Sequence, residues 1–165
     1  MEAEKRRNRA DSGIQLVTFR LGAESYGVPV WMVKEIIRPI DTFKVPGMTH
    51  NVEGVINLRG VIIPILRIHF VLGVKSGDGG EETRKTRIII LDAERDGFGF
   101  IVDEVMEVVR VSSEDVQPSP DVGKNGSFEE AVIGIVQISG QMVICIDPRK
   151  LVAGCLDAKE FASSC

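Results

Sequence analysis

Two stretches of this chain share one pattern of apolar and polar residues. The first, Gly54–Leu66, has two runs rich in Val and Ile on either side of Arg59-Gly60, and the second, Gly134–Ile146, repeats it with Ser139 in place of Arg59. Val and Ile favour extended backbone because a branched Cβ packs well on a pleated sheet, and glycine adopts the positive φ that tight turns often need. Each stretch is therefore predicted to form a β-hairpin.

The segments before these hairpins also match one another. Tyr26–Ile37 aligns with Phe98–Val109 without a gap, and Gln15–Leu21 alternates apolar and polar residues as a half-buried strand does. Matching blocks in the same order indicate an internal duplication. Short strands with Gly or Pro at most turns favour two small β-barrels over a sandwich, with short helical turns at Arg67–Gly73 and Asp147–Val152.

Composition along the chain predicts the boundaries of these units. Residues 1–13 are expected to be a disordered charged tail, and residues 74–85 a glycine-rich linker. The strands lie within residues 14–152, so the first barrel is expected mainly in 14–73 and the second mainly in 86–152, with a C-terminal tail at 153–165. The sequence leaves open whether the two halves exchange strands.

The overall composition is that of an ordinary globular protein. The chain has 165 residues, of which 44% are hydrophobic and 27% charged, and its net charge is −4. A net negative charge disfavours nucleic acid as a partner, because binding to phosphates depends on a basic field. No apolar run is long enough to cross a bilayer, and the basic N-terminal residues are not followed by the apolar region of a signal peptide. A cytoplasmic location is therefore expected.

Reactive side chains do not form a recognisable catalytic or metal-binding pattern. The three cysteines are too widely spaced for a paired metal or redox motif, and Cys145 lies in a strand pattern as a small buried hydrophobe would. His50 and His69 are the only histidines. Glu35 and Glu107 occupy equivalent positions of the repeat, which favours structural roles over paired acid-base catalysis. We expect neither enzymatic activity nor a cofactor or metal.

Arg59 and Glu35 are the more informative pair. Both lie in the first half of the chain, and the second half has Ser139 at the position equivalent to Arg59. Two interpretations have equal support from the spacing. The residues form a surface salt bridge that contributes little to stability, or they fix the edge of a binding surface, where Arg is a common anchor residue.

The string Gly54–Pro64, preceded by Tyr26-Gly27-Val28 and Val33–Ile36, resembles the CheW family of bacterial chemotaxis coupling proteins, and the likeness extends from about Leu16 to Leu151. This resemblance implies a mainly β fold of two SH3-like five-stranded barrels. It also implies a non-catalytic adaptor that couples the cytoplasmic tips of methyl-accepting chemotaxis receptors to the regulatory domain of the histidine kinase CheA. Such a protein is expected in the cytoplasm at receptor clusters, without membrane insertion or nucleic-acid binding.

The resemblance also assigns candidate receptor-binding residues. Glu35 and Arg59 match a pair near the receptor-binding surface of the family, with Val33 beside them. Further candidates match positions that affect receptor or kinase contact in the family, although several of them are equally suited to shaping the barrels: Gly54, Ile88, Gly99, Val105, Val108 and Gly134. No residue is assigned to kinase binding.

One segment departs from the family pattern. After Pro64 the family continues toward an Asp-Leu pair, whereas this chain has Arg67-Ile68-His69. The changed charge leaves two alternatives open besides the standard adaptor. The chain is the coupling protein of a variant chemosensory system, or it is a β-barrel binding module for another ligand.

Overall fold

The computed structural model describes residues 13–72, 83–91, 97–119 and 131–155. The first half of the chain forms β1 (Ile14–Leu21), β2 (Glu24–Pro29), the short 3-10 helix η1 (Val30–Met32), β3 (Val33–Ile37), β4 (Val52–Leu58), β5 (Val61–Leu66) and α2 (Ile68–Leu72). The second half forms β6 (Arg87–Leu91), β7 (Phe98–Val102), β8 (Glu104–Val111), η2 (Ser113–Asp115), β9 (Val132–Ile138), β10 (Gln141–Ile146) and α4 (Pro148–Cys155). The predicted class, mainly β with short helical turns, is confirmed.

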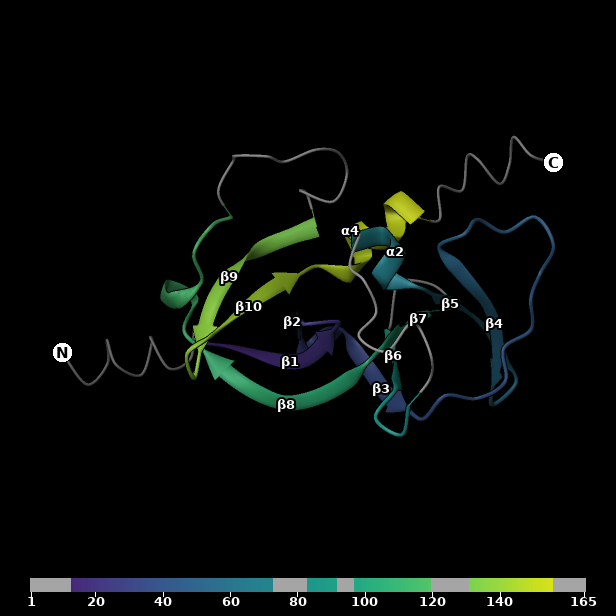
Figure 1. Ribbon diagram of the computed structural model, residues 1–165, viewed down its shortest axis with the longest axis horizontal. Helices are drawn as coiled ribbons and strands as arrows, with labels where there is room; N and C mark the ends of the chain where they lie inside the picture. The colour runs from purple at the N-terminus through teal and green to yellow at the C-terminus, as the bar shows by residue number, and fades with distance from the viewer. Residues whose placement is uncertain (1–12, 73–82, 92–96, 120–130, 156–165) are drawn as a thin grey trace.

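The strands form two five-stranded mixed sheets. Sheet A has the order β8-β1-β2-β10-β9, and sheet B has the order β3-β6-β7-β5-β4 (Figure 1). The only parallel neighbours among the described strands are β2 with β10 and β5 with β7. Each strand of the first half corresponds to the strand five places later, so that β1 corresponds to β6 and β5 to β10. When every strand is replaced by its counterpart, the order of sheet A becomes that of sheet B, and the internal duplication inferred from the sequence is visible in the topology.

Each sheet takes strands from both halves of the chain, residues 14–73 and 86–152, so the halves exchange strands, a possibility that the sequence left open. Sheet A combines β1 and β2 with β8–β10, and sheet B combines β6 and β7 with β3–β5. The reason lies in the connections. Only η1 separates β2 from β3 and only Asp103 separates β7 from β8, so neither connection reverses the chain as a hairpin would, and the next strand enters the other sheet.

The two predicted hairpins have the same turn geometry. In β4–β5 the turn residues Arg59 and Gly60 have φ values of 53° and 88°, and in β9–β10 Ser139 and Gly140 have 50° and 81°. Positive φ at both central residues defines a type I′ turn, whose twist matches that of antiparallel strands. Both hairpin predictions are confirmed. The two turns have the same backbone conformation and differ in the residue at the first turn position, which is Arg59 in one and Ser139 in the other.

One central apolar cluster joins the two sheets. Phe19 of sheet A lies between Tyr26 of the same sheet and Phe100 of sheet B, with ring centroids 6.0 Å and 5.4 Å away. Ile68 of α2 and Leu151 of α4 are buried in the same cluster, and Figure 1 shows the two helices side by side above the region where the sheets meet. Smaller apolar clusters lie within each sheet. Because residues of both sheets are buried in this one cluster, it holds the two sheets together.

Candidate partner-binding surface

Arg59 and Glu35 form a two-point ion pair. Arg59 Nη1 donates to Glu35 Oε2 at 2.7 Å, and Nη2 donates to Oε1 at 3.1 Å. The turn that carries Arg59 is fixed by Asn57, whose Oδ1 accepts the Gly60 N–H at 2.8 Å. The Arg59 side chain remains 73% exposed, and that of Glu35 is 24% exposed. The pair is thus a charged feature of the surface whose basic member is open to solvent.

The ion pair also connects the two ends of sheet B. Glu35 lies on β3, the first strand in the order, and Arg59 follows β4, the last. The sheet must therefore curl for the two side chains to meet. The hydrogen bond from Arg59 lowers the pKa of Glu35 below its ordinary value, and the same bond raises the pKa of Arg59. Both shifts favour the charged form of the group concerned.

Sheet A has no counterpart of this pair. Ser139 takes the same left-handed backbone conformation as Arg59 but has no charge, and Glu107, the equivalent of Glu35, is exposed on β8. Of the two interpretations of Glu35 and Arg59, the structure thus supports at least the first, a direct ion pair. Of the two turns with this geometry, only the first carries the ion pair.

The other candidate residues differ in burial. Val33 and Val105 are partly buried against the central cluster, and Ile88 is 1% exposed inside sheet B. Val108 is 55% exposed, but it lies on β8 of sheet A rather than beside the ion pair. The structure therefore brings together Glu35 and Arg59, places Val108 on another strand edge, and buries Ile88.

The candidate glycines are positions of close packing. A Cβ on Gly54 would lie 2.6 Å from the carbonyl oxygen of Phe43, and one on Gly134 would lie 2.6 Å from that of Gln117. In both cases the segment before the strand crosses its edge and forms two backbone hydrogen bonds, Phe43 with Val55 and Gln117 with Ile135. Gly99 lies in the interior of sheet B, where a Cβ would meet side-chain ends at 2.9 Å. Each of these glycines allows a neighbouring segment or side chain to approach the strand more closely than a Cβ would permit.

The segment that departs from the family pattern is paired within the chain. Arg67 forms an ion pair with Glu53, and its backbone N–H donates to the Asn51 carbonyl at 2.7 Å. The equivalent Asp147 instead accepts the Arg149 N–H at 3.0 Å at the start of α4. The reversed charge at position 67 is therefore matched by an acidic neighbour.

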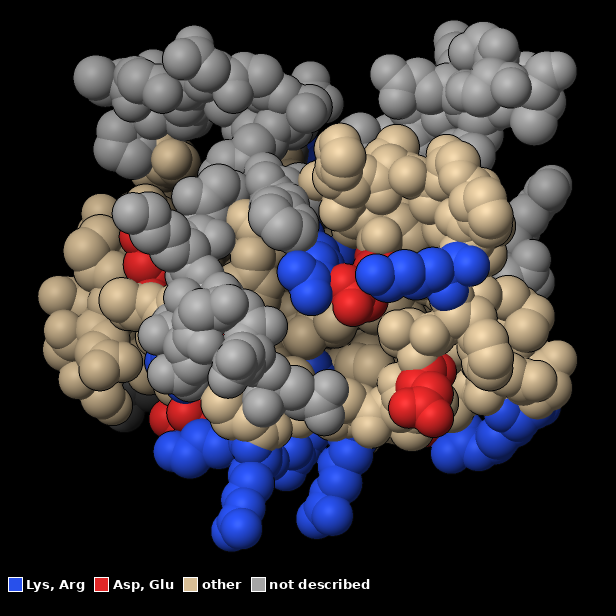
Figure 2. Space-filling model, turned by 45° about the vertical axis from the view of Figure 1, so that its right-hand side comes forward, with Lys and Arg blue, Asp and Glu red and all other residues tan. Residues whose placement is uncertain are grey.

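Several exposed apolar side chains were not predicted from the sequence. Ile36, next to Glu35 on β3, is 39% exposed, and Ile62 on β5 is 56% exposed. Phe43, in the segment that crosses β4, is 64% exposed. Figure 2 turns the end of the molecule that carries β4 toward the viewer and shows Lys and Arg side chains along the lower margin, with further basic and acidic side chains in the middle of the face. Exposed apolar side chains among charged ones are common at protein interaction sites.

The described residues give no support to redox or metal chemistry. They contain no group of three or more His, Cys, Asp or Glu side chains placed to hold a metal ion. Cys145 is 2% exposed, as predicted, and burial raises the pKa of its thiol to about 11. Within the same residues, no helix has the length and apolar character needed to cross a membrane.

Comparisons with known proteins agree with this description. The family model for the CheW-like domain matches residues 15–154. The chemotaxis protein CheW of Treponema pallidum is 38% identical over 143 residues, covering 86% of this chain and 83% of its own length. The CheW protein of Rhizobium meliloti is 32% identical over 138 residues, covering 83% and 86%. The crystal structure of the scaffolding protein TtCheW from Thermoanaerobacter tengcongensis matches with a TM-score of 0.72 and 30% identity, covering 81% of this chain and 84% of that one.

The two-sheet frame and these similarities define a non-catalytic scaffolding protein. The chain belongs to the CheW family, and it is a coupling protein of chemotaxis. The predicted family, the predicted fold class and the predicted non-enzymatic function are thereby confirmed.

Proposed function

We propose that this protein joins the cytoplasmic tip of a methyl-accepting chemotaxis receptor to the regulatory domain of the histidine kinase CheA, in the cytoplasm at receptor clusters. Membership of the CheW family supports this function. The central cluster also supports it, because two sheets that share one apolar core hold their outer surfaces in a fixed relative geometry. An adaptor of this kind transmits a signal through the contacts it makes with both partners.

The observation that carries the proposal is the Glu35–Arg59 pair. It is fixed by two hydrogen bonds and a type I′ turn, is exposed at Arg59, and has no equivalent at Ser139. A preorganised Arg loses little entropy when it contacts a partner. We therefore propose that Arg59 touches the receptor tip and that Glu35 orients it.

The remaining candidate residues have two roles in this proposal. Val108 is exposed enough to contact a partner directly. The partly or fully buried positions maintain the shape of the receptor-binding surface: Val33, Gly54, Ile88, Gly99 and Val105. Substitutions of these residues are expected to act on binding through the fold.

The test is isothermal titration calorimetry, which measures the affinity of the purified chain for a soluble receptor-tip hairpin and, separately, for the CheA regulatory domain. Arg59→Glu is expected to weaken receptor-tip binding at least about tenfold, as loss of an interface anchor does. Arg59→Ser, which copies the residue of the second turn, is expected to have a smaller effect in the same direction. The matched control is Ser139→Glu, which introduces the same charge on the same turn backbone in sheet A.

Three outcomes would contradict the proposal. The folded wild-type chain binds neither partner at micromolar concentrations, or Ser139→Glu weakens receptor binding as much as Arg59→Glu does, or Arg59→Glu leaves the receptor affinity unchanged. Thermal unfolding of each variant separates a lost contact from a lost fold. The exchanged pair Glu35→Arg with Arg59→Glu shows whether Arg59 itself is needed or only the ion pair.

A further inference from the structure

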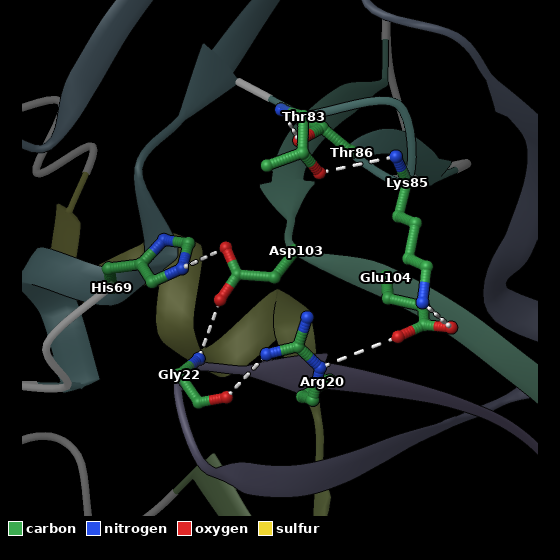
Figure 3. Close-up of polar contacts among 8 residues, drawn as sticks. All are labelled: Arg20, Gly22, His69, Thr83, Lys85, Thr86, Asp103 and Glu104. Carbon is green, nitrogen blue, oxygen red and sulfur yellow. Dashed lines mark hydrogen bonds and ion pairs between the residues drawn. The ribbon is translucent and has the colours of Figure 1, made fainter. Parts of the chain in front are cut away.

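The turn Thr83–Thr86, immediately before β6, is ordered by its two threonines (Figure 3). The Thr86 N–H donates to the Thr83 carbonyl at 3.3 Å, and the Thr83 N–H donates to Thr86 Oγ1 at 2.8 Å. Thr83 Oγ1 also accepts the Lys85 N–H at 3.2 Å. Thr86 is only 6% exposed, whereas Arg84 and Lys85, at the two central positions, are exposed. The turn therefore presents two adjacent cations on an ordered backbone.

Two more arginines lie beside this turn. Nη1 of Arg87 donates to the carbonyls of Arg84 at 2.9 Å and Thr86 at 2.7 Å, so this side chain folds back along the turn. The register of β3 with β6, continued by one residue, places the exposed Arg38 opposite Arg87. Like charges at opposing positions do not stabilise a strand pair, so strand pairing does not account for them. We call these four residues the basic patch: Arg38, Arg84, Lys85 and Arg87.

Within the part of the chain that the structure describes, Glu104 is the only acidic residue that forms an ion pair with the basic patch. Its Oε1 lies 3.8 Å from Lys85 Nζ, and its Oε2 lies 3.5 Å from Arg20 Nε. Figure 3 shows that Lys85 and Arg20 reach this carboxylate from different segments, while the neighbouring Asp103 is turned toward His69. One carboxylate is thus shared between two cations, and Lys85 remains 68% exposed.

The second copy of the fold has no facing pair of cations at this position. The internal alignment matches Arg38 with Arg110 and Arg87 with Gln15, and Gln15 lies opposite Arg110 where β1 pairs with β8. The equivalent strands thus pair with a single cation. The two facing arginines of sheet B are therefore not required by the strand order.

We propose that the basic patch is a docking site for an acidic segment of a partner protein. Clusters of Arg and Lys recognise acidic motifs through charge-assisted hydrogen bonds. The ordered turn reduces the entropy that its cations lose when a partner binds. The whole chain has a net charge of −4, so it lacks the extended basic field that favours binding to nucleic acid or to an anionic membrane.

The basic patch is a contact separate from the Glu35–Arg59 pair. Glu35 lies opposite Ile90, which is three residues after Arg87, so the patch begins about 10 Å further along the sheet. The proposal therefore does not depend on the receptor contact proposed for Arg59, and it is tested with the chain alone.

The probe is hexaglutamate, titrated at low salt into the isotope-labelled chain and followed by NMR. The backbone amides of Arg84 and Lys85 are expected to shift, with a dissociation constant of about 1 mM or lower that rises as salt is added. Hexaglutamine has no charge and is expected to leave these amides unchanged. Sedimentation with vesicles of phosphatidylcholine and phosphatidylserine in equal parts is expected to leave the chain in solution.

Charge reversal in the turn tests whether the position of the cations matters. Arg84→Glu combined with Lys85→Glu is expected to weaken hexaglutamate binding at least about tenfold. The matched control is Arg110→Glu combined with Lys150→Glu, which reverses two exposed cations on β8 and α4 and gives the same net charge. It is expected to weaken binding by less than about twofold.

Substitution of Thr83 tests whether the ordered turn matters apart from its charge. Thr83→Ala removes the acceptor of the Lys85 N–H and leaves every cation in place. It is expected to weaken hexaglutamate binding about threefold, because the turn loses part of its preorganisation. Thr83→Ser keeps the hydroxyl and is expected to bind as the wild type does. Equal affinities of Thr83→Ala and the wild type would contradict a site built on this turn.

Three other results would overturn the proposal. Hexaglutamate leaves the amides of Arg84 and Lys85 unshifted at low salt, or the control pair weakens binding as much as the turn pair does, or the vesicles bind the chain more tightly than hexaglutamate does. The last result would assign the patch to a lipid surface. Arg84→Gln combined with Lys85→Gln provides the same test should charge reversal prevent folding. Failure of receptor or kinase binding in the calorimetric titrations has no bearing on these measurements, so the two proposals are tested separately.

Discussion

The substitution Gly54→Ala tests whether Gly54 shapes the proposed receptor-binding surface or contacts a partner directly. An added Cβ would lie 2.6 Å from the Phe43 carbonyl oxygen, whereas ordinary contacts begin at 3.4 Å, so the crossing segment has to move by about 0.8 Å. That segment is held by two backbone hydrogen bonds of 2.8 Å between Phe43 and Val55. Overpacking and weakening of these bonds are together expected to destabilise the protein by about 2 to 3 kcal/mol.

The assay is urea denaturation combined with hydrogen exchange. Gly54→Ala is expected to lower the unfolding midpoint without changing the slope, and to reduce protection of the Phe43 and Val55 amides. Gly134→Ala separates the clash from backbone strain, because its Cβ would lie the same 2.6 Å from the Gln117 carbonyl in sheet A, whereas Gly54 also has a positive φ of 155°. Gly60→Ala is the control for backbone strain alone, since no atom lies within 4 Å of its Cβ while its φ is 88°.

The reasoning is refuted by one clear combination of results. If the free energy of unfolding of Gly54→Ala lies within about 0.5 kcal/mol of the wild-type value, the predicted clash does not exist. If it also keeps the amide protection of Phe43 and yet loses receptor binding, Gly54 acts by direct contact. Gly134→Ala would then be expected to leave receptor binding intact.

Two further predictions concern buried polar atoms. Thr18, which is 3% exposed where the pairing of β1 with β8 shifts register, donates to the Glu107 carbonyl at 2.7 Å and accepts the Glu107 N–H at 3.1 Å. Thr18→Val is expected to cost about 1 to 3 kcal/mol in urea denaturation, because both backbone groups lose their partner, whereas Thr18→Ser stays close to wild type. Burial raises the pKa of the Cys145 thiol from 9.0 to about 11, so the folded protein favours the protonated thiol, and stability is expected to fall as the pH rises from about 9 toward about 11. Alkylation of Cys145 at about pH 8, followed by peptide mass spectrometry, is accordingly expected to be slow until denaturant is added, and equal rates with and without denaturant would contradict this.

The local structure of the strands was predictable, but their partners were not. The Arg59-Gly60 and Ser139-Gly140 turns are short-range features, and the sequence identifies them because few residues adopt positive φ without strain. Strand pairing is long-range. Most strands here are rich in Val and Ile, and a period of two indicates which face is buried without indicating which strand lies alongside. The pairing of β3 with β6 and of β1 with β8 therefore required the structure.

The candidate site was predictable to a similar extent. The pairing of Glu35 with Arg59 was proposed from the sequence, because opposite charges stood in one half of the repeat and not in the other. The exposure of Ile36 and Ile62 was not predicted from the sequence, because both residues belong to runs of Ile and Val that predict burial on either face. Which of these side chains are exposed depends on how all five strands of sheet B are ordered, and that order is long-range information.

The duplication provides an internal reference for function. Equivalent strands occupy the same place in the two sheets, so a difference in side chain between equivalent positions is not required by the strand order. Arg59 and Ser139 occupy the same left-handed turn position, and His69 and Arg149 occupy the same position after equivalent strands. The first difference gives sheet B an ion pair that has no equivalent at Ser139, and the second accompanies a change of partner, because His69 contacts Asp103 whereas Arg149 lies over the Trp31 ring. Only the first difference leaves the neighbouring backbone unchanged, so the exchange Arg59→Ser is the one that separates function from fold.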